Sequence, residues 1–242
     1  MSMHKLANTF VRVIDFETTG FPEDEGAAVC EVGFVDLDLQ TLEISNEWQS
    51  FVDPCRPIPP IARAVHHISD ADVAGAQKFG SVQISMGSGT QGGILCAHND
   101  RFERAFYDPD QRQWIDTYRC ALRAWPDVPS HSNQSLRYLL DIDAESDFDP
   151  NMAMPPHRAL PDAYVTAFIL RRLLHLRPVD RLIEISSQPA LLVRCGFGKY
   201  RGKTFKEVAA SDPGYLRWLV DKSDMGEDVK FTAKYYLSVV SA

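Results

Sequence analysis

The chain has 242 residues, of which 45% are hydrophobic and 24% are charged, a balance typical of a folded globular protein that excludes extensive disorder. Its five cysteines are scattered and never spaced as CxxC, which argues against a disulfide framework and a thiolate zinc site and favours the reducing cytoplasm. No run approaches the roughly 20 apolar residues that span a bilayer, and the N-terminus lacks a signal-peptide core, so membrane and export functions are not expected.

The net charge of −8 is unevenly distributed. Residues 190–242 carry nine basic and six acidic side chains, a net of +3, so residues 1–189 carry −11. This division suits a protein that neutralises clustered carboxylates with cations and holds phosphates on a basic segment. A solvated surface with random clustering explains the charge equally well.

Periodicity and turn residues predict the elements of the first half of the chain. β-Branched and aromatic residues predict an antiparallel meander of three strands, over residues 9–17, 27–38 and 42–52. The prolines of residues 53–60 form a loop, and a short helix follows over 61–68. Glycine and serine over residues 80–93 predict a turn region that leads into a strand over 94–98.

Helices dominate the second half. The expected order is a helix, a strand and two helical segments, over residues 101–107, 113–118, 120–125 and 133–140. Apolar residues at spacings of three and four predict a long helix over 158–176 that ends before Pro178. From about residue 190, strand-like segments around glycine-rich turns and then helical patterns indicate a small second domain.

Two acids interrupt the first predicted strand. Asp15 and Glu17 lie two residues apart, so their carboxylates point to the same face of the sheet. Burying two unpaired carboxylates costs several kcal/mol, so cations or hydrogen-bond donors are expected between them. A lone DxE is more often a strand end that emerges into solvent, but here the sequence Thr-Thr-Gly follows it directly.

Three separated motifs resemble those of the DnaQ-like (DEDDh) exonuclease superfamily. DFETTG (15–20) resembles the first motif, AHNDRFE (97–103) resembles the second, HNxxFD, and HRALPDA (157–163) resembles the third, in which the aspartate follows the histidine by five positions. The resemblance implies an α/β, RNase H-like fold, with a mixed five-stranded sheet flanked by helices and the first motif on the central strand. It also implies an exonuclease domain over residues 1–180.

The resemblance also implies a role for each motif residue. Asp15, Glu17, Asp162 and the acid of the second motif would bind two divalent cations, Mg²⁺ or Mn²⁺, because oxygen ligands suit these ions. Two such cations stabilise the charge that develops during phosphodiester hydrolysis. His157 would act as the general base that takes the proton of the attacking water.

The acid of the second motif departs from the family pattern. Glu103 stands where the family has an aspartate, and Asp100 is a second acid in the same segment. We prefer Glu103, because it lies four residues after the motif asparagine and follows Phe102 as the pattern demands.

The superfamily further implies contacts with the substrate. It places Phe16, Thr18 and Thr19 near the terminal nucleotide. It places His98 and Asn99 near the acid of the second motif. The segment VHHIS (65–69) resembles a small helix that supports the terminal base in relatives, with His66 a better match than His67. Either histidine is as well explained by a structural role.

The C-terminal residues carry a narrower resemblance. GFGKYRGK (196–203) and DPGYLRWL (212–219) resemble the C-terminal region of the bacterial exodeoxyribonuclease X family, as does YRCALRAWP (118–126). This implies a small α+β domain over residues 190–242 and a 3′→5′ exonuclease that releases 5′-mononucleotides from DNA, preferably single-stranded, in DNA repair or degradation.

Basic and aromatic residues alternate in this C-terminal segment. Phosphate contacts are expected from Lys199, Arg201 and Lys203, beside Tyr200 and Phe205 as a stacking surface. The helical spacing of Tyr215, Leu216, Trp218 and Leu219 instead favours a core face.

Two alternatives remain. An RNA-trimming enzyme of the same superfamily shares the catalytic motifs, which do not read the 2′-hydroxyl. A non-catalytic nucleic-acid-binding or polymerase-associated module is favoured only by Glu103. The sequence does not indicate the oligomeric state.

Overall fold

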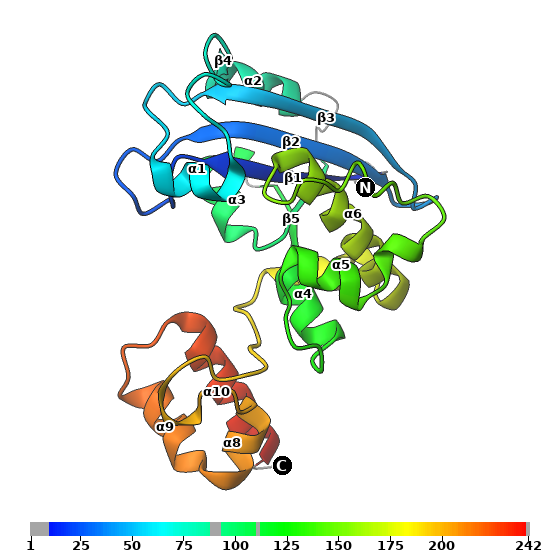
Figure 1. Cartoon of the computed structure of the whole chain (residues 1–242). Coiled ribbons are helices and arrows are strands. Elements are labelled where there is room, and N and C mark those ends of the chain that lie inside the picture. Colours follow the sequence, from blue (N-terminus) through cyan, green and yellow to red (C-terminus); the bar gives the residue numbers. More distant parts are fainter. Residues whose placement is uncertain (1–9, 88–92, 110–111, 241–242) are drawn as a thin grey trace, which may run out of the picture.

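The computed structural model describes residues 10–87, 93–109 and 112–240. Their strands form one mixed sheet in the order β4-β3-β2-β1-β5-β6 (Figure 1). The strands are β1 (Phe10–Thr18), β2 (Val29–Asp38), β3 (Ile44–Asp53), β4 (Gln77–Lys78), β5 (Ile94–Ala97) and β6 (Trp114–Asp116). The predicted antiparallel meander of β1, β2 and β3 is confirmed, and β5 and β6 add to β1 in parallel.

The sheet has one strand more than predicted. β4 is two residues long and pairs in parallel with β3 at the edge. Without β4, β1 is the central strand of five, as the resemblance implies. The predicted start of β1 at residue 9 lies outside the described residues.

Helices cover both faces of the sheet (Figure 1). The main helices of the body are α1 (Pro60–His66), α2 (Phe79–Gly87), α3 (Arg101–Phe106), α4 (Thr117–Ala124), α5 (Asn133–Leu139), α6 (Ala159–Leu176) and α7 (Val179–Ser186), with the short turn η2 (Ile142–Ala144). The long predicted helix corresponds to α6. No described helix is long and apolar enough to cross a membrane.

The prediction of a turn region over residues 80–93 is wrong for residues 80–87. Helix α2 forms there, because Val82 and Met86, four residues apart, are both buried in the apolar cluster on one face of the sheet. Residues 88–92 of that prediction lie outside the described part of the chain. The sequence analysis also missed α7, whose Leu182 and Ile185 pack into the cluster on the opposite face.

Alternation along β1 divides its side chains between two hydrophobic clusters. Val11 and Val13 pack on the face covered by α4, α5, α6 and α7, whereas Ile14 and Phe16 pack on the face covered by α2 and α3. Asp15 and Glu17 lie an even number of residues after Val11 and Val13, so their side chains point to the same face of the sheet as these valines. Both acids therefore continue the α6 face of the strand beyond the point where its apolar core ends.

The approach of α6 to the sheet depends on Gly33. This residue pairs with Asp15 across β1 and β2, and a Cβ atom at Gly33 would lie 2.2 Å from the backbone nitrogen of Leu160. No side chain fits at this distance. The missing side chain lets the first turn of α6, which carries Asp162, pack directly on the sheet beside Asp15.

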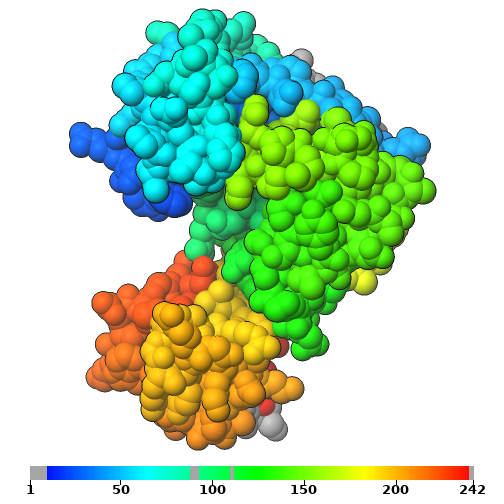
Figure 2. All heavy atoms as spheres, in the orientation of Figure 1, coloured from blue at the N-terminus to red at the C-terminus, as the bar shows by residue number. Residues whose placement is uncertain are grey.

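The C-terminal residues pack around a separate hydrophobic cluster. Its helices are α8 (Phe205–Ser211), α9 (Pro213–Asp221) and α10 (Glu227–Val240), preceded by the turn η3 (Gly198–Tyr200). Figure 2 shows them as a lobe with a recess between it and the body. We call residues 190–240 the C-terminal lobe.

The C-terminal lobe is more helical than predicted. Within its described residues, the expected strands are reduced to a single bridge between Arg194 and Thr204. The core face expected on α9 is wrong in part, because Leu216 and Leu219 are fully buried but Trp218 is 49% exposed. Trp218 therefore lies on the surface of the lobe.

Candidate active site

Three carboxylates from two distant segments meet beside the end of β1. One oxygen from each of Asp15, Glu17 and Asp162 lies within 4.8 Å of the others. The strand alternation supplies the first two acids, and the close packing of α6 on Gly33 supplies the third. The structure thus brings together three of the four predicted cation ligands.

The electrostatics of these acids show that they share one poorly solvated space. Burial raises the pKa of Asp15 well above its usual range, with further contributions from Asp162, Glu103 and Glu17. Burial and then the charge of Asp162 raise the pKa of Glu17 to about 8. Burial also raises the pKa of Asp162. Four carboxylates in this arrangement repel one another unless positive charge is added.

The fourth acid of this group is Glu103. Burial raises the pKa of Glu103 well above its usual range, and its charge acts directly on Asp15. Glu103 is 4% exposed, and its Oε2 atom has no hydrogen-bond donor among the described residues. Such an atom is costly to bury and indicates a missing cation or donor.

Asp100, the alternative acid, faces a different set of charges. Its Oδ1 lies 3.3 Å from Nη2 of Arg119 and its Oδ2 lies 3.6 Å from Nη1 of Arg104. Arg119 also pairs with Asp116 at 3.2 Å, which joins α3 to the start of α4. Both oxygens of Asp100 also lack a hydrogen bond within the described residues, so that feature does not separate the two acids. The arginines beside Asp100 and the charge of Glu103 on Asp15 favour Glu103 as the site acid.

Two donors orient the Asp162 carboxylate. Nε2 of Gln134 donates to Oδ1 at 2.9 Å, and the backbone amide of His157 donates to Oδ2 at 2.9 Å. The sequence analysis missed Gln134, because nothing in the segment NQSLRYLL distinguishes a site residue from a polar helix position.

His157 enters α6 with an exposed side chain and a strained backbone. Its φ of +59° is uncommon outside glycine, and such conformations cost about 1–3 kcal/mol and gather at functional sites. The next residue, Arg158, forms an ion pair with the buried Glu31, which also accepts the Ala159 amide at 3.0 Å. Glu31 lies in β2 and thus attaches the segment that contains His157 to this strand. The sequence analysis missed Glu31.

The two polar residues at the start of the second motif are placed differently. The ring nitrogens of His98 already have partners, Thr117 Oγ1 at 2.9 Å and the His131 carbonyl at 2.8 Å, and burial lowers the pKa of His98 to about 4. A neutral His98 therefore holds the chain in position. Asn99 is exposed with a φ of +74°, and its backbone amide donates to Oδ1 of Asp116 at 3.1 Å.

A largely apolar cavity of about 500 Å³ opens beside Glu17. It is bounded by the end of β1, the following loop, helix α1 and one side chain of α3, and its lining includes Thr18, Thr19, Ile61, Val65, His66 and Phe102. Ile61 is 78% exposed, so the cavity has an apolar wall open to solvent. Of the predicted contacts, the two threonines and His66 therefore line a space next to the acids.

The side chains of two predicted substrate contacts, Phe16 and His66, have other partners within the fold. Phe16 is buried on the opposite face of the sheet, 5.8 Å from the Phe79 ring between centroids, because it alternates with Asp15 and Glu17. Its side chain cannot reach a ligand beside those acids. His66 lines the cavity but is 2% exposed, and its two nitrogens bond the Thr18 carbonyl and the Ile68 amide.

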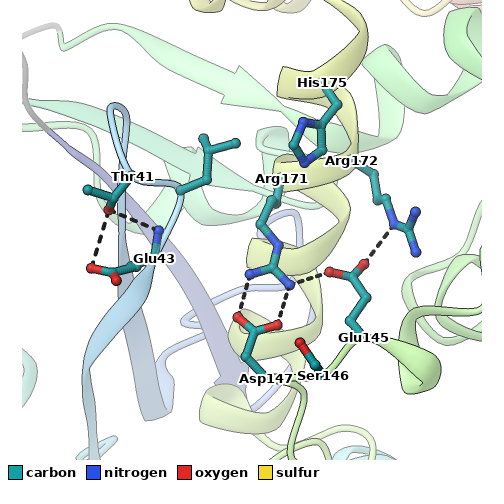
Figure 3. Close-up of a pocket in the computed structure, with 9 residues that line it drawn as sticks. Thr41, Glu43, Glu145, Ser146, Asp147, Arg171, Arg172 and His175 are labelled. Atoms are coloured by element: carbon teal, nitrogen blue, oxygen red, sulfur yellow. Dashed lines mark hydrogen bonds and ion pairs between the residues drawn. The ribbon is translucent and has the colours of Figure 1, made fainter.

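A second cavity, also of about 500 Å³, lies along the later turns of α6 (Figure 3). Its cationic side chains are already neutralised. Arg171 pairs with Asp147 at 2.6 Å and with Glu145, and Glu145 also accepts from Nε of Arg172 at 2.7 Å. The carboxylates of Asp147 and Glu145 are thereby occupied by arginines.

The donor set fits divalent cations. Hard oxygen ligands suit Mg²⁺ or Mn²⁺, the carboxylates are gathered within reach of one another, and one buried oxygen of Glu103 lacks a partner among the described residues. Cations would also offset the repulsion that raises the pKa values of Asp15 and Glu17.

This fold and acidic cluster define a DnaQ-like exonuclease. Residues 13–170 match the family described as "Exonuclease", and residues 196–224 match the family described as "Exodeoxyribonuclease X-like C-terminal". The first match covers more than half of the chain. The chain therefore belongs to the exonuclease family.

Particular relatives resemble between 62% and 94% of the chain. Exodeoxyribonuclease 10 of Escherichia coli is 34% identical over 234 residues, which cover 94% of this chain and 98% of that protein. The DNA polymerase III subunit epsilon of Treponema pallidum is 27% identical over 62% of this chain and 70% of its own. A solved structure, Exonuclease X in complex with 5′ overhanging duplex DNA, has a TM-score of 0.62 and 28% identity, and covers 73% of this chain and 99% of that one.

Proposed function

We propose that this chain, a 3′→5′ exodeoxyribonuclease, releases 5′-mononucleotides from 3′ ends of DNA, with a preference for single strands, by a mechanism that uses two divalent cations. The observation that carries the proposal is the convergence of Asp15, Glu17 and Asp162 within 4.8 Å, with the charge of Glu103 acting on Asp15. The whole-length similarity to Exodeoxyribonuclease 10 supports DNA as the substrate.

The four acids would hold the cations, Mg²⁺ or Mn²⁺. When bound, the cations supply positive charge where phosphodiester hydrolysis develops negative charge, on the phosphate, the attacking water and the leaving 3′ oxygen. Gln134 and the His157 amide orient Asp162, so this ligand is held in place before the substrate arrives.

His157 would take the proton of the attacking water. Its exposed side chain lies five residues before Asp162, and its own backbone amide donates to the Asp162 carboxylate, so the residue lies beside the acids. Histidine is the side chain that most often serves as a general base.

The cavity beside Glu17 would bind the terminal nucleoside. Its apolar wall, with Ile61, Val65 and Phe102, offers a stacking surface for a base, and Thr18 and Thr19 lie between this wall and the acids. The phosphate of a terminal nucleoside in this cavity would lie next to Glu17, which would favour cleavage one nucleotide at a time from an end.

The C-terminal lobe would form the predicted small domain of residues 190–242 and hold the strand that leads to the site. Arg201 and Lys203 are exposed and form no ion pair within the described residues, so both are free to meet phosphates. Lys199 pairs with Asp212 at 3.0 Å and is less available.

The test compares oligonucleotides labelled at the 3′ or the 5′ end, incubated with Mn²⁺ or with a chelator. We expect the 3′ label to leave at once as a mononucleotide and the 5′-labelled strand to shorten stepwise, only with Mn²⁺. Matched DNA and RNA strands separate the alternatives. Equal or faster cleavage of RNA contradicts the choice of DNA, and binding without any turnover contradicts the enzyme.

A further inference from the structure

Three aromatic rings form a continuous row on the C-terminal lobe. The centroids of Tyr200 and Tyr215 lie 5.0 Å apart in an edge arrangement, and those of Tyr215 and Trp218 lie 5.7 Å apart with the rings 25° from parallel. We call these three residues the aromatic row. Its outer member, Trp218, is 49% exposed, so one end of the stack is open to solvent.

The aromatic row is held rigidly. Leu216 and Leu219 anchor α9 in the core of the lobe, and the Asp212 side chain caps the helix by accepting the Tyr215 amide at 3.0 Å. Gly198 packs closely on the row, because a Cβ there would lie 2.7 Å from the Tyr215 hydroxyl. An exposed ring that is fixed in advance loses little entropy when a ligand stacks on it.

The charge around the aromatic row suits a polyanion. The ammonium group of Lys199 lies 4.9 Å from the Tyr200 centroid and 5.2 Å from the Tyr215 centroid, and its partner Asp212 is already paired with it. Arg217, next to Trp218 in α9, and Arg201, next to Tyr200, are exposed and form no ion pair within the described residues. Residues 190–242 carry a net charge of +3, against −11 for the rest of the chain.

The lobe is attached beside the active site. Arg101, two residues before Glu103 in α3, pairs with both carboxylate oxygens of Asp228 in the first turn of α10, each at 2.9 Å. Asp228 also accepts the Ala190 amide at 2.7 Å, at the start of the lobe. The helix that bears a proposed cation ligand therefore also holds the lobe, and Figure 2 shows the recess that separates the lobe from the body.

We infer that the exposed face of Trp218 binds an unpaired base of single-stranded DNA upstream of the 3′ end, with Arg201 and Arg217 on the neighbouring phosphates. An exposed ring beside cations that form no ion pair is the pattern of a single-strand binding surface, in which bases stack and phosphates are neutralised. The inference rests on the proposed function, because it makes the same strand occupy the lobe and the cavity beside Glu17. The C-terminal lobe then determines how long a strand must be to bind well.

The first experiment measures binding without cleavage. Oligothymidylate of about 30 nucleotides exceeds the ~4–16 nucleotides that a small binding fold covers, and an oligomer of about 3 nucleotides reaches only one site. In chelator, we expect the long oligomer to quench tryptophan fluorescence in the wild-type protein. Trp218→Ala should remove this quenching and raise Kd for the long oligomer about 5- to 150-fold, the range for loss of one stacked base.

Two variants separate stacking from structural damage. Trp218→Phe keeps a ring and should retain most of the affinity while losing the fluorescence signal. Tyr235→Ala removes another exposed ring of the same lobe, 42% exposed on α10, and should leave Kd at the wild-type value. With Mn²⁺, Trp218→Ala should raise the ratio of KM for the long to KM for the short oligomer.

An unchanged Kd for Trp218→Ala, in a protein that still cleaves DNA, overturns the inference. The exposed face of Trp218 would then be a candidate contact for a protein partner instead. An equal loss of affinity in Tyr235→Ala also overturns it, because the effect would then be unspecific. A wild-type protein that binds DNA through Trp218 in chelator but never cleaves with Mn²⁺ contradicts the proposed function and supports the inference.

Discussion

Replacing Glu17 by Gln should stabilise the metal-free protein above neutral pH. In the absence of cations, burial and Asp162 raise the pKa of Glu17 from its ordinary value of 4.5 to about 8. The folded protein therefore binds this proton more tightly than the unfolded chain. The protonated Glu17 therefore contributes to the free energy of unfolding, fully below pH 4.5 and no longer once the pH has risen through 8. Gln keeps the shape of the side chain and cannot become charged.

The size of the effect follows from the pKa change. A rise from 4.5 to about 8 corresponds to at most roughly 5 kcal/mol between the two ends of this pH range. Relaxation of the site reduces this, so we expect about 2–5 kcal/mol. For a chain of this size, that free energy shifts Tm by about 4–20 °C. The Tm of the wild-type protein should fall by this amount between pH 5 and pH 8.5, and the Tm of Glu17→Gln should fall by less.

The assay is thermal unfolding in chelator at several pH values, for wild type and Glu17→Gln. Glu43→Gln is the matched control, because Glu43 is an exposed acid beside Asp38, which pairs with Phe10 at the end of β1 opposite to Glu17. Addition of Mn²⁺ should raise the Tm of the wild type most at high pH, since the ions compete with protons for the carboxylates. A wild-type Tm independent of pH, or a Glu17→Gln protein less stable at pH 8.5, refutes the reasoning.

Three further predictions follow from the neighbouring contacts. The Glu103→Asp variant should retain cleavage. The Asp100→Ala variant should have a lower Tm, because it loses its arginine contacts, but should still cleave DNA. If Asp100→Ala abolished cleavage at an unchanged Tm, Asp100 and not Glu103 would be the site acid. His157→Ala should lower kcat about 100- to 10,000-fold with little change in DNA affinity measured in chelator, and an unchanged kcat would remove it as the base. Arg101→Ala should speed limited proteolysis between residues 187 and 192, as should Asp228→Ala, because each breaks the exposed pair that holds the lobe; equal digestion rates would show that other contacts hold it.

The sequence predicted the elements where a single local pattern determines the structure. The strands β1, β2 and β3 and helix α6 follow from apolar periodicity, and the pair Asp15 and Glu17 follows from the two-residue repeat of a strand. Helix α2 was missed because its glycines outweighed the burial of Val82 and Met86, which only the folded sheet provides.

The supporting residues of the site could not be predicted, because they act through contacts distant in sequence. Glu31 meets Arg158 only after β2 and α6 pack together, and Gln134 meets Asp162 across two helices. Gly33 gave a weak signal as a glycine within a strand, which often marks close approach of another backbone. The exposure of Trp218 depends on which face of α9 the lobe buries.

The most direct test of the central claim is anomalous diffraction from crystals soaked with Mn²⁺ and a 5′-mononucleotide. The account predicts two manganese peaks about 4 Å apart that contact the carboxylates of Asp15, Glu17, Glu103 and Asp162. Manganese bound at Asp100 and Asp116 instead, or no ion among the four carboxylates at saturating Mn²⁺, would contradict it.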